Sequence, residues 1–458
     1  MSKIKKFFLW LGGFVAVAAA VIGVGMAFFG LRFDRDGTGM RPMPYVDRSE
    51  QRLQEIEQRA AVEHQPAAEA TAQPVTAPVD MTAPWPAFYG ASHDGVYRDG
   101  PITLDWPAKG LPTVWRRPVG GGYASMVVAQ GRVFTIEQRR DQEVAAAYDL
   151  KTGRELWSNS WKAFFQESMG GDGPRATPAW ADGRVYVLGA EGEFRCLDAL
   201  TGKTQWRTNV LGDSAAPNLQ WGMAASPLVG DNMGIVMPGK GLAAYDKASG
   251  ARLWTALEDK AAYTAPMVAT LNGQRQIVAV TGERAVGLTL DGGKLLWSHP
   301  WKTDYEINSS LPLIVDGNHL ILTAGYGHGS AMLELTVEGA RELWQSKAMK
   351  CKFSNAVLHK GVVYGLDEGI LAAMDAQTGQ KKWKGGRYGF GQLLLAGDHL
   401  VVLSETGEVV LVKASPAGHE ELARFEAIDG KTWNVPAMAD GFLLVRNGAE
   451  MACYRIGK

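Results

Sequence analysis

Short apolar runs separated by polar, glycine-containing turns recur along the chain from about residue 85 onward. One unit shows the pattern: residues 176–180, 182–188, 192–198 and 202–206 form four runs, with β-branched and aromatic residues inside them and Gly or Asp between them. Runs of this length and composition, bounded by such turns, predict β-strands. We therefore expect four short antiparallel strands in each unit.

Each unit ends on an aromatic residue, and these residues follow one another at steps of 39 to 49 positions, ending at Phe425. A period of 40–50 residues with several strand signals in each unit indicates a β-propeller. We expect each ring to lie on an outer strand and to bury itself against the next blade. The tryptophans of the repeat are Trp115, Trp157, Trp206, Trp254, Trp297, Trp344 and Trp383.

A hairpin turn precedes the tryptophan in most units. Its Asp lies eight residues before the Trp, and its Gly lies four residues before it. Asp accepts hydrogen bonds from backbone N–H groups two or three residues further on, and Gly adopts the left-handed conformation that a bulged hairpin requires. The Asp positions are Asp149, Asp198, Asp246 and Asp375, and the Gly positions are Gly153, Gly202, Gly250, Gly293 and Gly379.

Counting from Trp115 gives eight units, of which the last is incomplete. Residues 432–456 contain three runs and no closing Trp. The segment around Trp115 is expected to supply the missing outer strand, because joining the first and last strands in one blade closes the ring and removes two exposed edges. The predicted fold is all-β, an eight-bladed propeller over residues 85–458. In such a ring, Trp254→Ala should cost about 3–5 kcal/mol, as for a buried aromatic side chain.

Residues 147–157, AYDLKTGRELW, match the repeat signature A-x-D-x-x-T-G-x-x-x-W, and related copies recur. The repeat resembles that of the pyrroloquinoline quinone (PQQ)-like propellers, and the eight units on a tethered chain resemble the family of the outer-membrane assembly factor BamB. The entry segment from Trp85 to Gly90, with Asp94 and Gly95 following, resembles that of the same broad family. The resemblance implies a non-catalytic, protein-binding propeller. No Cys follows the apolar N-terminal stretch, so the lipid anchor of that family is not expected here.

The N-terminal residues predict a membrane anchor. Residues 1–6 carry three lysines, and residues 7–29 carry no charge. At 1.5 Å per residue, 23 residues span about 34 Å, enough to cross a bilayer core. We expect an uncleaved signal anchor at 7–29, a cytoplasmic tail at 1–6 and an exported remainder. This places the protein in a bacterial inner membrane as a single-pass chain with its propeller in the periplasm.

Residues 30–84 are expected to form a stalk and linker. Within residues 30–47, Asp34 and Asp36 suggest calcium, but Tyr45 stands where an EF-hand loop needs a Glu, so a solvated juxtamembrane turn is favoured. Residues 48–64 are polar and helix-prone, which indicates a short stalk helix. Residues 65–84 are rich in Ala, Pro, Thr and Val, which is typical of a flexible or semi-extended spacer.

Composition excludes several function classes. Hydrophobic residues make up 46% of the chain and charged residues 21%, and the net charge is −1, so no basic footprint for nucleic acid is present. The cysteines, Cys196, Cys351 and Cys453, are far apart and are expected to be small buried residues, with their pairing left open. The sequence contains no metal-ligand motif, and we expect no metal site.

Candidate binding residues must then come from the faces and axis of the propeller. We chose residues near the start of a unit, or on a loop leaving it, that combine aromatic rings with hydrogen-bonding groups, as small-ligand pockets do. His328 lies between glycines, where a chain could approach a ligand closely, although a plain turn is the favoured interpretation. The candidates are Tyr123, Arg175, Trp221, Tyr263, Asn308, His328, Asn355 and Trp433.

Two main functions follow. The favoured one is a membrane-anchored scaffold that binds a protein partner in the cell envelope, without catalysis, in envelope or outer-membrane protein assembly. The alternative is a PQQ-dependent dehydrogenase, and a weaker one is a sensor of a sugar, peptide or other small ligand. Enzymes that the repeat resembles hold PQQ and calcium with an adjacent Cys–Cys disulfide, a Trp and an Asp base. No two cysteines are adjacent here, so we expect no cofactor and no catalytic residue.

Overall fold

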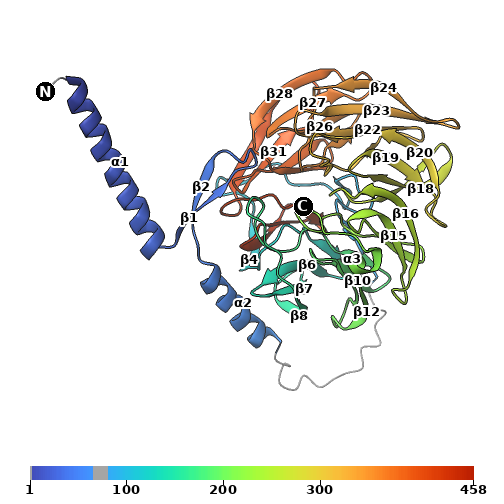
Figure 1. Ribbon diagram of the computed structural model, residues 1–458, viewed down its shortest axis with the longest axis horizontal. Coiled ribbons are helices and arrows are strands. Elements are labelled where there is room, and N and C mark those ends of the chain that lie inside the picture. The colour runs from blue at the N-terminus through green and yellow to red at the C-terminus, as the bar shows by residue number, and fades with distance from the viewer. Residues whose placement is uncertain (1–2, 65–80, 458) are drawn as a thin grey trace.

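The computed structural model describes residues 3–64 and 81–457, and within them the chain forms an eight-bladed β-propeller with an N-terminal extension (Figure 1). Parts of the predicted tail at 1–6 and spacer at 65–84 lie outside the described residues. Each blade is an antiparallel sheet whose strands follow one another in chain order, apart from the last blade. The first strands of neighbouring blades, such as β5 and β9, contact one another, so these strands surround the axis.

The eight blades account for almost all strands. Blades 1 to 4 contain β5 (Val127–Ala129), β6 (Arg132–Arg139), β7 (Gln142–Asp149), β8 (Glu155–Lys162); β9 (Ala179–Ala181), β10 (Arg184–Leu188), β11 (Glu193–Asp198), β12 (Thr204–Asn209); β13 (Leu228–Gly230), β14 (Met233–Val236), β15 (Lys240–Asp246), β16 (Arg252–Lys260); and β17 (Met267–Leu271), β18 (Gln274–Val280), β19 (Arg284–Leu288), β20 (Leu295–Pro300). A short helix, α3 (Val210–Ser214), links blades 2 and 3.

Blades 5 to 8 complete the ring. They contain β21 (Leu313–Ile314), β22 (His319–Ala324), β23 (Gly329–Thr336), β24 (Gly339–Ser346); β25 (Val357–His359), β26 (Val362–Asp367), β27 (Ile370–Asp375), β28 (Lys381–Arg387); β29 (Gln392–Ala396), β30 (His399–Leu403), β31 (Glu408–Lys413), β32 (Glu421–Glu426); and β33 (Ala437–Ala439), β34 (Phe442–Arg446), β35 (Glu450–Arg455), β4 (Thr113–Pro118). The short β3 (Val96–Tyr97) pairs in parallel with β29.

The ring closes as the sequence predicts. Strand β4 pairs antiparallel with β35, and Trp115 lies opposite Cys453. The first strand of the last blade, β33, also contacts β5 of blade 1. The N-terminal and C-terminal parts of the propeller therefore share one blade, which removes two free sheet edges.

The turns that carry the Asp have the predicted chemistry. The Asp149 carboxylate accepts hydrogen bonds from the Lys151 and Thr152 backbone N–H groups at 3.1 and 2.8 Å, and Asp198 and Asp246 accept equivalent bonds. Gly153 has φ +71°, in the region that Gly adopts without strain. The predicted hairpin turns are therefore confirmed, and they depend only on residues a few positions apart in the sequence.

The glycine of one blade supports the tryptophan of the blade before it. A Cβ added at Gly202 would lie 2.5 Å from the Trp157 ring, and one at Gly153 would lie 2.6 Å from the Trp115 ring. The Trp157 Nε1 donates to the Ala199 carbonyl at 3.1 Å, and Trp115 donates to the equivalent Leu150 carbonyl. The same glycine contact holds Trp206, Trp254 and Trp344 against Gly250, Gly293 and Gly379. The ring and the glycine thus lock each blade to the next.

Trp297 and Trp383 depart from this arrangement. The turn of blade 5 lacks the Asp-x-x-Thr-Gly sequence, and Trp297 Nε1 instead donates to Gln276 Oε1 of its own blade at 2.6 Å. Trp383 donates to the Ser415 carbonyl at 2.8 Å. Both differences follow from the worn repeat of the next unit along the chain.

The N-terminal extension contains two helices and a hairpin. Helix α1 (Lys3–Phe28) projects away from the ring, while α2 (Ser49–Glu63) lies beside blades 1 and 8 (Figure 1). Within the described residues, no helix meets the combined length and hydropathy that a membrane span requires. The anchor at residues 7–29 stays a prediction from the sequence.

The segment predicted as a solvated juxtamembrane loop is instead a two-stranded hairpin. Strands β1 (Leu31–Arg35) and β2 (Pro42–Val46) pair antiparallel, with Leu31 opposite Val46. The turn between them is buried at Gly37. The prediction of a solvated turn at residues 30–47 is wrong for Gly37, which is buried against the ring, whereas residues 38–40 are exposed.

Candidate functional site

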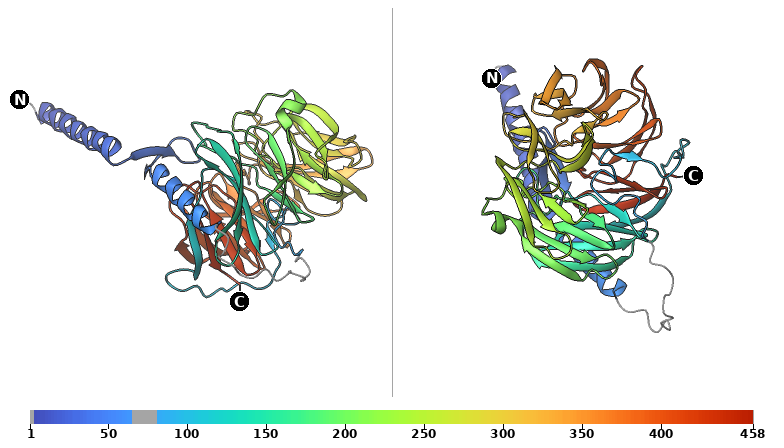
Figure 2. Two further views of the ribbon diagram at one scale, coloured as in Figure 1. Left: turned by 90° about the horizontal axis from the view of Figure 1, so that it is seen from below. Right: turned by 90° about the vertical axis from the view of Figure 1, so that its right-hand side faces the viewer.

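A cavity of about 730 Å³ lies on the propeller axis. It is lined by the loops that lead into the first strands of the blades, together with Phe88 of the entry segment and the tip of the β1–β2 hairpin. Figure 2 shows the hairpin and the segment around β3 on opposite faces of the ring. The cavity is therefore narrowed from both faces by chain that precedes the first blade.

Six of the eight predicted residues line this axial pocket. Each precedes the first strand of its blade by a few residues, so the ring brings equivalent positions together. They are Tyr123, Arg175, Trp221, Tyr263, Asn355 and Trp433. The structure thus gathers them in one place, and whether they bind a ligand remains a prediction.

Two predicted residues lie elsewhere. Asn308 is buried, and its Nδ2 donates to the Thr281 and Trp301 carbonyls at 2.8 and 3.1 Å, so it joins two loops. His328 packs edge-on against the Trp301 ring, with centroids 4.4 Å apart, and burial lowers its pKa. Neither side chain lines the pocket. A position near the start of a unit does not determine the direction of the side chain. The side chains of Asn308 and His328 point toward neighbouring loops and not toward the axis.

The aromatic rings of the pocket pack against one another in three groups, one of which is Tyr305 and Tyr326, edge to face with centroids 5.4 Å apart. Tyr123 stacks on Trp433 with centroids 5.4 Å apart, and Phe353 lies 4.9 Å from the same Trp433. Trp221 and Tyr263 meet edge to face at 5.5 Å. Such pairs contribute beyond the area they bury and hold rings in fixed orientations. The pocket wall is therefore built from supported rings.

Cations lie over several of these rings. Lys431 Nζ is 4.3 Å from the Trp433 centroid, Lys352 Nζ is 4.8 Å from that of Tyr326, and the Arg175 guanidinium is 4.6 Å from that of Phe165. A cation over an aromatic face is attracted by the ring quadrupole. The axis therefore carries positive charge in a partly dry environment.

Burial shifts the protonation equilibria of these groups. Burial lowers the pKa of Lys352 and of Arg175 from their ordinary values. Burial acts on Lys431 in the same direction, but Tyr123 and the Asp34 carboxylate outweigh it, and the pKa of Lys431 is raised. Lys431 therefore keeps its charge through its partners.

One buried carboxylate of the ring contacts two residues that line the pocket, and the sequence analysis did not single it out. Glu405 is 7% exposed, and it accepts hydrogen bonds from Trp433 Nε1 at 2.8 Å and from the Gly37 backbone N–H at 2.6 Å. Lys352, Lys431 and Phe353 were also missed. Lys352 and Phe353 stand three and two positions before the predicted Asn355, so the start of that unit was the available signal.

The hairpin tip contributes directly to the pocket. Gly37 donates its N–H to Glu405, and its carbonyl accepts from Lys352 Nζ at 2.6 Å. Asp34 forms an ion pair with Lys431 at 2.5 Å. The tip is closed by the Gly39 N–H, which donates to the Asp36 carbonyl at 2.8 Å. A second segment of the same chain therefore satisfies the polar groups of the ring.

The donor set does not suit the calcium that accompanies PQQ. Among the described residues, no three His, Cys, Asp or Glu side chains gather as a metal site would require. Calcium takes six to eight oxygen ligands, whereas the charged residues that line the pocket are Arg35, Lys352 and Arg175 with a single carboxylate, Asp36 of the hairpin. The three cysteines are free and buried, in separate blades. We therefore derive no redox chemistry from this pocket.

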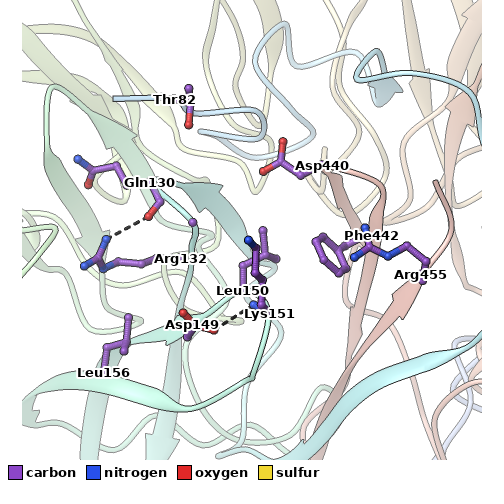
Figure 3. A pocket seen from close by; sticks show the side chains of 11 residues that line it. Thr82, Gln130, Arg132, Asp149, Leu150, Lys151, Leu156, Asp440, Phe442 and Arg455 are labelled. Carbon is purple, nitrogen blue, oxygen red and sulfur yellow. Dashed lines mark hydrogen bonds between the residues drawn. The ribbon is translucent and has the colours of Figure 1, made fainter. Parts of the chain in front are cut away.

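A second cavity, of about 680 Å³, lies where blades 1 and 8 meet (Figure 3). It includes the repeat turn at Asp149 and Lys151, where the Lys151 N–H donates to the Asp149 carboxylate. Arg455 lies 3.9 Å from the Phe442 ring centroid. This cavity is lined by residues at the junction where the ring closes, so we interpret it as a gap between two blades and not as a binding site.

Comparison with known proteins agrees with the architecture. The chain is 23% identical over 317 residues to the outer membrane protein assembly factor BamB of Bordetella pertussis, covering 64% of this chain and 73% of that protein. It is 26% identical over 300 residues to the BamB of Burkholderia pseudomallei, covering 62% of this chain and 71% of that protein. The crystal structure of BamB from Moraxella catarrhalis superposes with a TM-score of 0.56 at 15% identity, over 75% of this chain and 99% of that one, which shows a shared fold.

A family model assigns the chain to the same group of proteins. A PQQ-repeat family model, described as outer membrane protein assembly factor BamB, matches residues 140–385, more than half of the chain. The matched region contains the repeat turns and tryptophans of blades 2 to 6. With the eight blades, the glycine-supported tryptophans and the closing strand β4, this shows that the chain belongs to the BamB family of PQQ-like β-propellers.

Proposed function

We propose that this protein is a non-catalytic scaffold that binds a protein partner in the cell envelope and supports outer-membrane protein assembly. The observation that carries the proposal is the family match over residues 140–385. The relatives are named as assembly factors, and their names specify no reaction. A rigid ring that presents many loops suits such a role.

The pocket chemistry supports binding rather than turnover. Its rings are held by one another, its cations by neighbouring rings and backbone, and Glu405 already accepts bonds from Trp433 and Gly37. A general base needs an acceptor that is free to take a proton from a substrate. The residues on the axis are arranged as a recognition surface.

We also propose, on the sequence alone, that residues 7–29 attach the protein to the inner membrane and that the propeller lies in the periplasm. The stretch is uncharged, and lysines precede it. Extraction of membranes at alkaline pH should leave the full chain in the pellet. Recovery of the intact chain in the supernatant would contradict the anchor.

The assembly role is tested by deleting the protein in its own host. We expect the fraction of folded outer-membrane β-barrel proteins, measured by heat-modifiable migration, to fall when the gene is removed and to recover with the wild-type chain. The matched control is a chain with Leu295→Ser, because Leu295 is 47% exposed on an outer strand and away from the axis.

An unchanged folded fraction after deletion would contradict the proposed role. The dehydrogenase alternative is tested on the purified protein with PQQ and calcium in excess and an electron-accepting dye. We expect no oxidation of alcohols or sugars. Turnover that depends on PQQ would replace the scaffold proposal.

A further inference from the structure

The tip of the β1–β2 hairpin occupies the axial pocket in the manner of a bound peptide. Gly37 is buried, and both of its backbone polar groups are satisfied by side chains of the ring: Glu405 accepts its N–H at 2.6 Å, and Lys352 donates to its carbonyl at 2.6 Å. The contact spans 368 positions of sequence on one side and 315 on the other. Side chains from two blades thus bind one residue of a turn through its main chain.

This contact requires glycine. A Cβ at Gly37 would lie 2.2 Å from Phe390 Cδ2 and 2.6 Å from Phe390 Cβ, a separation that real side chains do not adopt. Phe390 cannot simply turn away, because the clash includes its own Cβ and its ring packs 5.5 Å from that of Phe353. Gly37 has no left-handed backbone angle, so the requirement comes from the pocket and not from the turn.

Acidic side chains flank the glycine and meet the cations of the pocket. Asp34 pairs with Lys431 at 2.5 Å, while Lys431 also lies 4.3 Å from the Trp433 centroid. Asp36 contributes an electrostatic interaction with Lys352. Lys431, which lies over a ring of the pocket, and Lys352, which lines it, are therefore matched by Asp34 and Asp36, and this part of the pocket is complementary to the acidic side chains of the turn.

The hairpin is attached through Gly37 and is otherwise largely exposed. Met40 of the turn is 86% exposed, and Tyr45 and Val46 of β2 are close to half exposed. An isolated two-stranded hairpin is marginally stable in water. What keeps it near the pocket is the following helix α2, whose Ile56 is 1% exposed and whose Glu63 pairs with Arg117. The tether raises the local concentration of a weakly held occupant.

We propose that the axial pocket binds an acidic, glycine-containing β-turn of a partner protein, and that residues 34–39 occupy the pocket until such a turn replaces them. The identity of the partner rests on the proposed assembly role, whereas the specificity of the pocket stands on the contacts above. The internal turn shows which features the partner turn needs. These are an Asp three positions before a Gly, and a Gly at which there is no room for a side chain.

The test uses the full chain and a synthetic peptide with the sequence of residues 31–46. In the Gly37→Val chain the internal tip is excluded by Phe390, and the peptide should bind at least about tenfold more tightly than it binds the wild-type chain. A Met40→Ala chain serves as the control, because Met40 is exposed at the same tip, and it should behave as wild type. Calorimetric titration measures the affinities.

Variants of the peptide test which residues of the turn the pocket recognises. A peptide with Gly37→Val should not bind the opened chain, and a peptide with Asp34→Asn should bind at least about fivefold more weakly. Adding Lys352→Met to the opened chain should abolish binding. Equal affinities of wild-type and Gly37→Val chains, or binding that survives Lys352→Met, would overturn the proposal.

A second variant that displaces the hairpin tip is needed in case Gly37→Val destabilises the propeller. If Gly37→Val lowers the unfolding temperature of the propeller, Asp34→Lys places like charges together at Lys431 and opens the pocket without a steric clash. The same gain in peptide affinity is expected, and its absence would overturn the proposal.

The two proposals fail separately. Loss of peptide binding in Lys352→Met with full β-barrel assembly in cells would show that the pocket does not serve the partner, and the assembly role would stand. Peptide binding with no assembly defect on gene deletion would refute the assembly role and leave the specificity of the pocket intact.

Discussion

The outer rim and the axis of the propeller are built from the same repeat but follow opposite rules. At the rim, the same contact recurs: a glycine of one blade lies under the tryptophan of the blade before it, as with Gly202 and Trp157. At the axis, corresponding positions carry Tyr123, Arg175 and Ala224 in consecutive blades. The repeated positions join the blades, and the varied positions form the pocket.

The physical reason lies in how many partners each position has. A rim tryptophan meets one neighbouring blade, so the same pair of residues, a tryptophan and a glycine, can pack the blades together at most junctions. An axial residue faces a cavity shared by all the blades, and its neighbours across that cavity differ. Variation at the axis therefore costs little stability and changes what the pocket can bind.

The largest expected effect is at the rim. Trp157 is 7% exposed, its ring lies against Gly202, and its Nε1 donates to the Ala199 carbonyl. Trp157→Ala should lower the free energy of unfolding by about 3–5 kcal/mol, because it leaves a cavity and an unpaired carbonyl. Chemical denaturation followed by circular dichroism measures the change.

Trp254 is the internal comparison for that substitution. Its ring also lies against a glycine, Gly293, but it is only partly buried and its Nε1 has no hydrogen-bond partner. Trp254→Ala should therefore cost about 1–2 kcal/mol, less than the 3–5 kcal/mol expected from the sequence. Equal losses for the two variants would mean that ring burial and the indole bond do not set the strength of a junction.

A second contact at the junction of blades 1 and 2 gives the next largest effect. Glu143 is fully buried and accepts hydrogen bonds from the Ala190 N–H at 2.8 Å and Trp161 Nε1 at 3.0 Å. Burial raises the pKa of Glu143 from 4.5 to about 7. The folded protein therefore binds the proton more tightly than the unfolded chain, and stability falls as pH rises from about 4.5 to about 7.

The size of this effect is about 3 kcal/mol, from a shift of roughly two to three pKa units. In Glu143→Gln this component disappears, so the variant should gain about 3 kcal/mol relative to wild type between pH 4 and pH 8. Urea denaturation at both pH values measures it. The control is Glu191→Gln, an exposed neighbour; the same gain there would assign the effect to general charge.

The smallest effect on stability is expected at the axis. Trp221 faces the pocket, is partly exposed and meets Tyr263 edge to face at 5.5 Å. Trp221→Ala should cost less than about 1 kcal/mol, as for a side chain outside the core. Denaturation under the conditions used for Trp157→Ala gives the comparison. A loss similar to that of Trp157→Ala would show that the axis is part of the core.

The sequence by itself determined the ring. Turn chemistry at Asp149 and Gly153 is local, and the spacing of the tryptophans repeats often enough to count eight blades and to place Trp115 in the last one. Six pocket residues also followed, because a fixed position in the repeat becomes a fixed position around the axis. The chemistry within these segments depends on neighbours a few residues away.

Only the tertiary structure decided what meets inside the ring. Gly37 reaches Glu405 across 368 positions, and Lys431 reaches Asp34, through contacts that no repeat period encodes. The directions of the Asn308 and His328 side chains could not be predicted from the sequence either. A repeat determines the backbone position of a residue, whereas the surrounding loops determine the direction of its side chain. Ring closure brings distant segments to one axis, and the charges, rings and hydrogen-bonding groups that converge there select their partners by shape and complementarity.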